Sequence, residues 1–109
     1  MRRAPDYVEA LEVLGHDYTL RGRFRDGLRV DLQLANLRPE NPLVHYNLAC
    51  SYALTEQTEQ AFQSLNAAID HGYRDFHWLS RDPDLAAFRK HPLYGKLRTR
   101  IRAMQVTVE

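Results

Sequence analysis

The sequence of 109 residues has one cysteine, five scattered glycines and no long apolar run. A single cysteine excludes an intramolecular disulfide and any zinc site built from several cysteines. Because no stretch approaches about 18 consecutive apolar residues, we expect no transmembrane segment. The N-terminal residues also lack the apolar core of a secretory signal, so we expect a cytoplasmic protein. The length fits one domain covering residues 1–109.

The net charge is close to zero, because the sequence contains 15 Lys and Arg residues and 14 Asp and Glu residues. This balance argues against binding of nucleic acid by bulk electrostatics. The charges are nevertheless segregated: residues 39–73 contain no Lys or Arg, whereas residues 85–108 contain six basic residues and no acidic one. Runs of this kind usually form solvated faces, so we expect the basic run to be the outer side of a terminal helix.

The sequence matches itself when it is shifted by 34 residues. The aligned pairs are Leu14 and Leu48, Gly15 and Ala49, Tyr18 and Tyr52, Gly27 and Ala61, and Leu34 and Ala68. Large residues fill the space between packed helices, and small residues let their backbones approach closely. The order of large and small positions therefore predicts two similar pairs of packed helices.

Helical spacing and turn residues agree with this period. The predicted helices cover residues 6–20, 24–37, 42–54 and 58–71, with a short helix after Asp82 and a final helix over residues 93–104. Thr58 is expected to cap its helix, Gly72 to follow the end of that helix, and Asp82 to cap the short helix ahead of Pro83. Strand signals are nearly absent, so we predict an all-α fold.

These residues resemble the tetratricopeptide repeat (TPR) family. The second unit carries the pattern residues Leu48, Ala49, Tyr52, Ala61, Leu65 and Ala68, and the first unit carries Leu14, Gly15, Tyr18 and Pro39. His45 stands at the usual Trp position. Asp31 stands where an apolar residue is usual, which indicates that its helix is rotated or locally more exposed. Residues 72–97 resemble the closing segment that follows the last repeat in many bacterial TPR proteins.

The resemblance implies a right-handed solenoid of helical hairpins, with about two repeats and a C-terminal cap. The first repeat would cover residues 8–41, the second residues 42–75 and the capping segment residues 76–105. A cap is needed because each repeat buries only part of its apolar face. The resemblance also implies a scaffold that binds another protein or peptide without catalysis of its own.

In this family the first helix of each repeat lines the concave, ligand-binding surface. Mapping that surface onto this chain by helical spacing gives Glu9, Glu12, Val13, His16, Thr19 and Leu20 in the first unit and Leu43, Tyr46, Asn47, Cys50, Ala53 and Leu54 in the second. The candidate contacts among them are Glu12, His16, Tyr46, Asn47 and Cys50. Tyr46 and Asn47 are the sharpest candidates, because a Tyr offers a rigid ring with a polar tip and an Asn can hydrogen-bond a peptide backbone. Packing between repeats is the alternative role for both residues.

The sequence contains little that indicates chemistry. Cys50 lacks an orienting group and an oxyanion-stabilising motif, so we expect a buried small residue rather than a nucleophile activated by His16. The five histidines lack metal-ligand spacing, and no glycine-rich loop is present, so we expect no metal and no cofactor. Trp78 is expected to seal the tail against the second repeat.

Three functional hypotheses remain. The first is a non-enzymatic TPR adaptor that binds a peptide or helix of a partner protein in its concave groove. The second is a small structural or assembly subunit of a larger complex, or a homodimer, held through an outer apolar surface. The third is a binder of nucleic acid or of an acidic surface that uses Arg98, Arg100 and Arg102.

Overall fold

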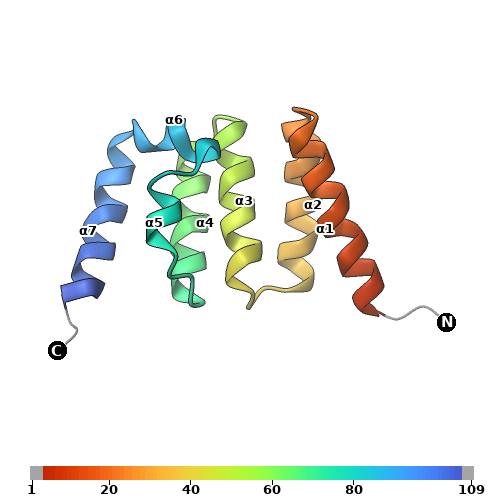
Figure 1. Ribbon diagram of the computed structural model, residues 1–109, viewed down its shortest axis with the longest axis horizontal. Helices are drawn as coiled ribbons and strands as arrows, with labels where there is room; N and C mark the ends of the chain where they lie inside the picture. The colour runs from red at the N-terminus through yellow and green to blue at the C-terminus, as the bar shows by residue number, and fades with distance from the viewer. Residues whose placement is uncertain (1–3, 107–109) are drawn as a thin grey trace.

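The chain is helical throughout the part that the structure describes. The computed structural model describes the backbone of residues 4–106 and the side chains of residues 7–105, and this part contains no strand. The helices are α1 (Ala4–Leu20), α2 (Phe24–Leu37), α3 (Pro42–Leu54), α4 (Thr58–Asp70), α5 (Phe76–Leu79), α6 (Ala86–Arg89) and α7 (Pro92–Val106), with a 3₁₀ turn, η1 (Pro83–Leu85), before α6 (Figure 1). The all-α prediction is therefore confirmed.

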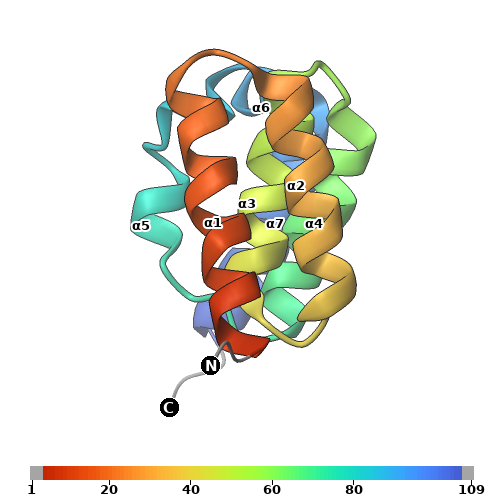
Figure 2. The same cartoon turned by 90° about the vertical axis from the view of Figure 1, so that its right-hand side faces the viewer.

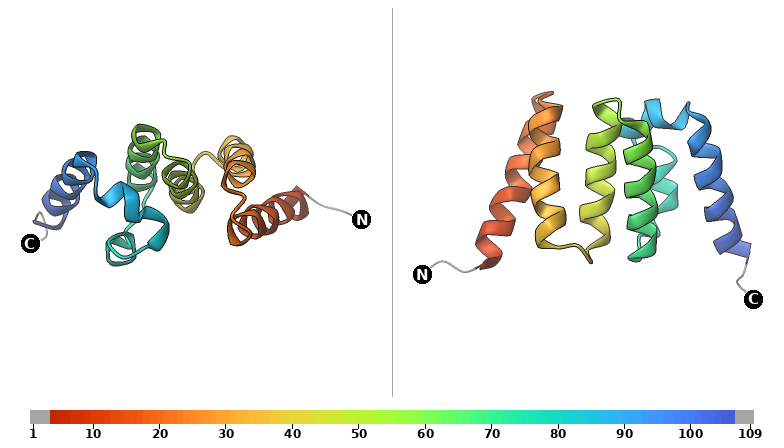
Figure 3. Two further views of the ribbon diagram at one scale, coloured as in Figure 1. Left: turned by 90° about the horizontal axis from the view of Figure 1, so that it is seen from above. Right: turned by 180° about the vertical axis from the view of Figure 1, so that it is seen from behind.

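The first four helices form two antiparallel hairpins that stand side by side. Helix α1 packs on α2, α3 packs on α4, and α3 also packs on α2, which joins the hairpins. Helices α1 and α5 lie on one side of the molecule and α2 and α4 on the other, as Figures 2 and 3 show. The molecule measures 49 × 31 × 19 Å, so it is long and thin.

Small residues occupy the closest approaches within each hairpin. A Cβ atom on Gly15 would lie 3.3 Å from Cγ1 of Val30, and one on Gly27 would lie 3.4 Å from Oγ1 of Thr19. In the second hairpin, Ala49 and Ala61 have no exposed surface. The prediction that small residues let these backbones approach closely is therefore confirmed.

The apolar core consists of two clusters of unequal size. The smaller one joins Leu11, Val30, Leu34 and Val44 of the first three helices. The larger one extends from α3 to α7 and contains the completely buried side chains of Leu65, Leu85 and Leu97. At the junction of the hairpins lies a buried polar pair, in which the Ser51 hydroxyl donates a hydrogen bond to Asp31 over 2.5 Å.

Helix α1 stands at the open end of the stack. Leu14 is 40% exposed, although its partner in the shifted alignment, Leu48, is only 6% exposed. The difference arises because α2 covers the corresponding side of α3, while no described helix covers that side of α1. Further exposed apolar side chains on α1 are Tyr7, Val13 and Leu20.

The closing segment packs back onto the second hairpin. Leu97 of α7 is fully buried, and Arg100 of α7 binds the Asp70 carboxylate over 2.6 Å and the Asn66 side-chain oxygen over 2.7 Å. The acidic second hairpin and the basic last helix thus attract one another within the chain. None of the described helices is both long and apolar enough to cross a membrane.

Several local predictions can be compared with the structure. Asp82 accepts a hydrogen bond from the backbone N–H of Asp84 over 2.9 Å, as expected of a cap, and Gly72 has a positive φ of 113° after the end of α4. The prediction for Thr58 is wrong, because Gln57 occupies the N-cap position and makes no side-chain cap bond. Asp31 is buried rather than exposed, because Ser51 satisfies its carboxylate.

Candidate functional site

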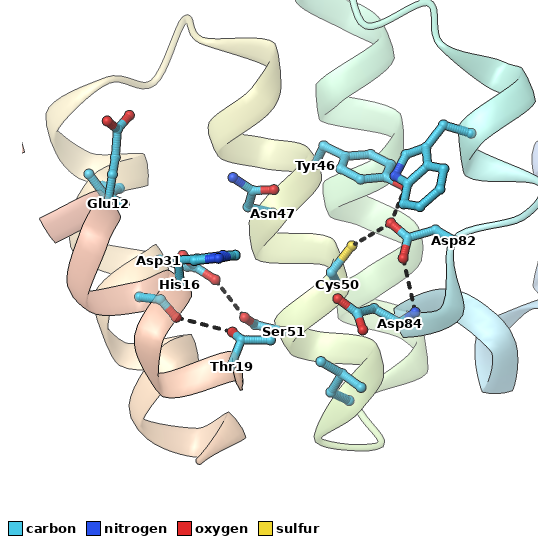
Figure 4. Close-up of a pocket in the computed structure, with 14 residues that line it drawn as sticks. Glu12, His16, Thr19, Asp31, Tyr46, Asn47, Cys50, Ser51, Asp82 and Asp84 are labelled. Carbon is cyan, nitrogen blue, oxygen red and sulfur yellow. Dashed lines mark hydrogen bonds between the residues drawn. The ribbon is translucent and has the colours of Figure 1, made fainter. Parts of the chain in front are cut away.

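A cavity of about 200 Å³ lies between α1, α3 and the segment that joins α5 to η1 (Figure 4). We call it the groove. Its lining contains Glu12, Gly15, His16, Thr19, Asp31, Leu34, Tyr46, Asn47, Cys50, Ser51, Leu54, Trp78, Asp82 and Asp84. All five residues that the sequence singled out are therefore brought together around one cavity.

The five predicted residues differ in accessibility. Glu12, His16 and Asn47 are exposed, with the first two on α1 and the third on the facing α3 (Figure 4). Tyr46 and Cys50 are only 4% and 6% exposed. The Tyr46 ring stacks on that of Tyr73 with centroids 4.5 Å apart. Tyr46 and Cys50 therefore form the floor of the groove, and the accessible polar groups are those of the other three residues.

Asp82 organises the wall of the groove opposite α1. One carboxylate oxygen accepts hydrogen bonds from the Tyr46 hydroxyl over 2.6 Å and from the Cys50 thiol over 3.7 Å. The other oxygen accepts from the backbone N–H of Asp84. Arg89 donates to the backbone carbonyl of Asp82 over 2.8 Å. Because these bonds join α3 to η1, Asp82 fixes one wall of the groove relative to its floor.

The hydroxyl and thiol groups that contact Asp82 stay protonated. Burial and the hydrogen bond to Asp82 raise the pKa of Tyr46, and burial together with the negative charge of Asp82 raises the pKa of the Cys50 thiol. Burial raises the pKa of Tyr73 to about 12. A raised thiol pKa is the opposite of what a nucleophilic cysteine requires. The expectation that Cys50 is a buried small residue is confirmed by its burial.

One group of three side chains in the described part of the chain has the spacing of metal ligands. Sγ of Cys50 and carboxylate oxygens of Asp82 and Asp84 lie within 4.8 Å of one another. Both oxygens of Asp82 already accept hydrogen bonds, and the Cys50 thiol holds its proton. Asp82 and Cys50 are therefore satisfied by the protein itself, and we assign no metal to the cluster.

Asp31 places a carboxyl group at the back of the groove. Burial raises the pKa of this carboxyl, and the hydrogen bond from Ser51 opposes the shift. The folded chain therefore holds the Asp31 proton more tightly than the unfolded chain does. It follows that the contribution of Asp31 to folding becomes more favourable as the pH falls from neutral through its raised pKa.

Replacement of Asp31 by Asn tests how much stability the buried negative charge costs. The Asn oxygen can still accept from Ser51 while the buried charge is removed, so we expect a gain in stability of roughly 1 kcal/mol near neutral pH. The gain should shrink as the pH falls, because the native Asp31 then becomes neutral too. Thermal unfolding at about pH 7 and about pH 4 measures both values.

The exposed ion pair between Asp17 and Arg21 supplies a control for this substitution. Asp17→Asn removes a carboxylate whose side chain is 46% exposed, so it should produce no gain at neutral pH. A stability difference between Asp31→Asn and the native chain that stays constant with pH would contradict the interpretation of Asp31.

Nine residues of the groove lining were not among the five predicted site residues, and four of these nine are acidic or aromatic. Asp82 was recognised only as a helix cap, and Asp31 was expected to lie on a rotated or locally more exposed helix. Trp78 was expected to seal the tail, but its side chain is 46% exposed and lines the groove. The expectation of a sealed Trp78 is therefore wrong, because α5 turns this side chain outward while burying Leu79.

Comparison with known proteins yields limited similarity. No family model matches the chain, and no solved structure matches it. The chain is 29% identical over 79 residues to a chloroplastic protein of Arabidopsis thaliana; the match covers 70% of this chain and 24% of that protein. The aligned part thus spans about a quarter of the length of this relative.

Proposed function

We propose that this chain is a non-enzymatic protein-interaction module of the TPR type, which binds a peptide or helix of a partner protein in the groove. One observation carries the proposal. The five candidate contacts, selected from the first helix of each sequence repeat, line a single cavity. This arrangement is what a binding surface built from successive repeats requires.

The arrangement of the helices supports a repeat architecture. Two hairpins follow one another at the 34-residue period, and small residues from the aligned positions are buried within both. The segment after the second hairpin covers the end of the larger core cluster with α7, whose exposed side carries Lys96, Arg98 and Arg102. This is the physical role of a capping element, because an uncovered terminal repeat would expose its apolar face.

The accessible groups of the groove suit recognition rather than catalysis. Asn47 presents a donor and an acceptor at the surface, as binding of an extended backbone requires. The thiol and phenol at the floor keep their protons and are already hydrogen-bonded to Asp82. Binding with no chemical step is therefore the function that this arrangement supports best.

A structural or assembly subunit is the second candidate, and a different surface favours it. Tyr7, Val13, Leu14 and Leu20 of α1 are between 40% and 73% exposed. Exposed apolar side chains concentrated on one element are typical of contact surfaces. The basic-helix hypothesis receives less support, because Arg100 is engaged by Asp70 and Asn66.

Filling the groove with a neutral side chain tests the proposed function. Asn47→Tyr should reduce recovery of the partner from extracts of the source organism by about tenfold or more, which corresponds to about 1.4 kcal/mol. The expected cause is steric, because Asn47 is exposed and lines the cavity. The measurement is quantitative affinity purification with mass spectrometry, with circular dichroism to show that the helices remain.

Gln63→Tyr is the matched control, because Gln63 is an exposed residue that does not line the cavity. It belongs to α4, the helix that lies on the side of the molecule away from α1 (Figure 2). This variant should recover the same partner in the native amount. Equal recovery with both variants would show that the groove is not the binding surface and would favour the exposed face of α1.

A further inference from the structure

The charge of the groove has one sign. Four acidic residues line it, namely Glu12, Asp31, Asp82 and Asp84, and no Lys or Arg is among the described residues of its lining. His16 is the one residue of that lining able to carry a positive charge. Within the described part of the chain, the ion pairs of Arg21, Arg23, Arg29 and Arg100 all lie outside the groove.

The two acidic residues nearer the opening are available to a ligand. Glu12 is an exposed residue of α1, and Asp84 is a half-buried residue of η1 on the opposite wall (Figure 4). Burial and the neighbouring Asp82 charge raise the pKa of Asp84. Neither Glu12 nor Asp84 takes part in an ion pair within the described part of the chain, so a positive charge placed between the walls would be attracted to them.

Apolar surface accompanies these carboxylates. Trp78 is 46% exposed at the groove, and Leu54 also lines the cavity. Leu20 and Leu43 are 73% and 58% exposed and lie four residues from His16 and Asn47 on the same helical faces. A ligand that fits must therefore combine positive charge with apolar contacts.

The size of the cavity limits what can enter it. About 200 Å³ is below the roughly 300–1,000 Å³ of typical small-molecule sites. A Lys or Arg side chain has an apolar stem and a charged head, so it can pack its stem against Trp78 while its head reaches a carboxylate. A guanidinium over the indole face of Trp78 would add a cation–π interaction.

We infer that the groove binds a cationic, amphipathic segment of a partner protein and receives one Lys or Arg side chain between Glu12, Asp84 and Trp78. The inference rests on the proposed function and adds the chemical class of the partner. It is carried by charge complementarity together with the exposed Trp78 of the groove and the exposed Leu20 and Leu43 on the same helical faces.

Trp78 supplies a direct readout, because it is the only tryptophan in the chain. The probes are two synthetic helical peptides with the same pattern of leucines, one with arginines and one with glutamates at all other positions. The arginine peptide should shift the emission of Trp78 saturably, and its affinity should fall as salt is added. The glutamate peptide should leave the emission unchanged.

Variants assign the effect to the two accessible carboxylates. The double variant Glu12→Gln/Asp84→Asn should weaken binding of the arginine peptide by about tenfold or more. The matched control is Glu40→Gln/Glu59→Gln, which makes the same change in net charge at two exposed residues outside the cavity. This control should bind like the native chain, apart from a small change common to any loss of negative charge.

Each other outcome overturns the inference. Equal binding of the two peptides would show that charge does not select the ligand, and equal weakening by the two double variants would show that the groove is not involved. No emission change with either peptide would reject a cationic ligand. An emission change caused by raising the protein concentration alone would identify a second copy as the occupant. Asn47→Tyr decides the proposed function separately, because it blocks a ligand of any charge.

Discussion

Replacement of Leu97 by Ala is expected to lower the free energy of unfolding by about 2–5 kcal/mol. Leu97 has no exposed surface and belongs to the larger core cluster, in which α7 packs against α4 and α6. The loss combines the transfer free energy of the removed atoms with the cavity they leave. For a domain whose total stability is about 5–15 kcal/mol, this is a large fraction.

Urea unfolding followed by helical circular dichroism and by Trp78 fluorescence measures this loss. Leu43→Ala is the control, because it makes the same chemical change at a side chain that is 58% exposed. It should change stability by no more than about 0.5 kcal/mol. If the two variants were equally stable, α7 would not be part of the core and its role as a cap would be wrong.

Replacement of Asp82 by Ala is expected to cost about 2–4 kcal/mol. The change removes the cap of η1 and also leaves the buried hydroxyl of Tyr46 and the thiol of Cys50 without their acceptor. We expect most of this loss of stability to come from the Tyr46 hydroxyl, which would be buried without a hydrogen-bond acceptor. A buried polar group without a partner cannot recover its hydrogen bonds to water.

The cap of α5 provides a control for this substitution. Asp75 accepts a hydrogen bond from the Trp78 backbone N–H over 3.1 Å, and the Asp75 residue is exposed. Asp75→Ala should therefore cost only the about 0.5–2 kcal/mol of a cap. Urea unfolding gives the loss of stability for both variants. The amount by which the loss for Asp82→Ala exceeds that for Asp75→Ala measures the contribution of the buried hydrogen bonds to Asp82. Equal losses would show that Asp82 acts as a cap alone.

The regular helices could be predicted because their signals are local. Gly22, Pro39 and Pro42 interrupt the apolar spacing at turns, and the structure places helix ends beside each of them. Helix α2 covers residues 24–37 as predicted, and α3 begins at Pro42. The four-residue helix α5 was missed, since one turn carries no detectable period.

The groove could be predicted only in part. Helical spacing places Glu12 and His16 on one face of α1, so their shared position follows from sequence. The burial of Asp31 does not, because it depends on Ser51, which lies 20 residues away in the sequence. The bond between Asp82 and Tyr46 joins residues 36 apart. A cap signal identifies the acceptor Asp82 but contains no information on its distant donors.

Because the apolar core is divided into two clusters of unequal size, the two hairpins pack on the rest of the chain to different extents. The first is attached through the smaller cluster and the polar contact of Asp31 with Ser51, whereas the second shares the larger cluster with the closing segment. We therefore expect separation of the first hairpin to cost less free energy than separation of the second, and it would remove the α1 wall from the groove. A ligand that spans from Glu12 to Asp84 would oppose this opening, so occupancy and local unfolding are thermodynamically linked.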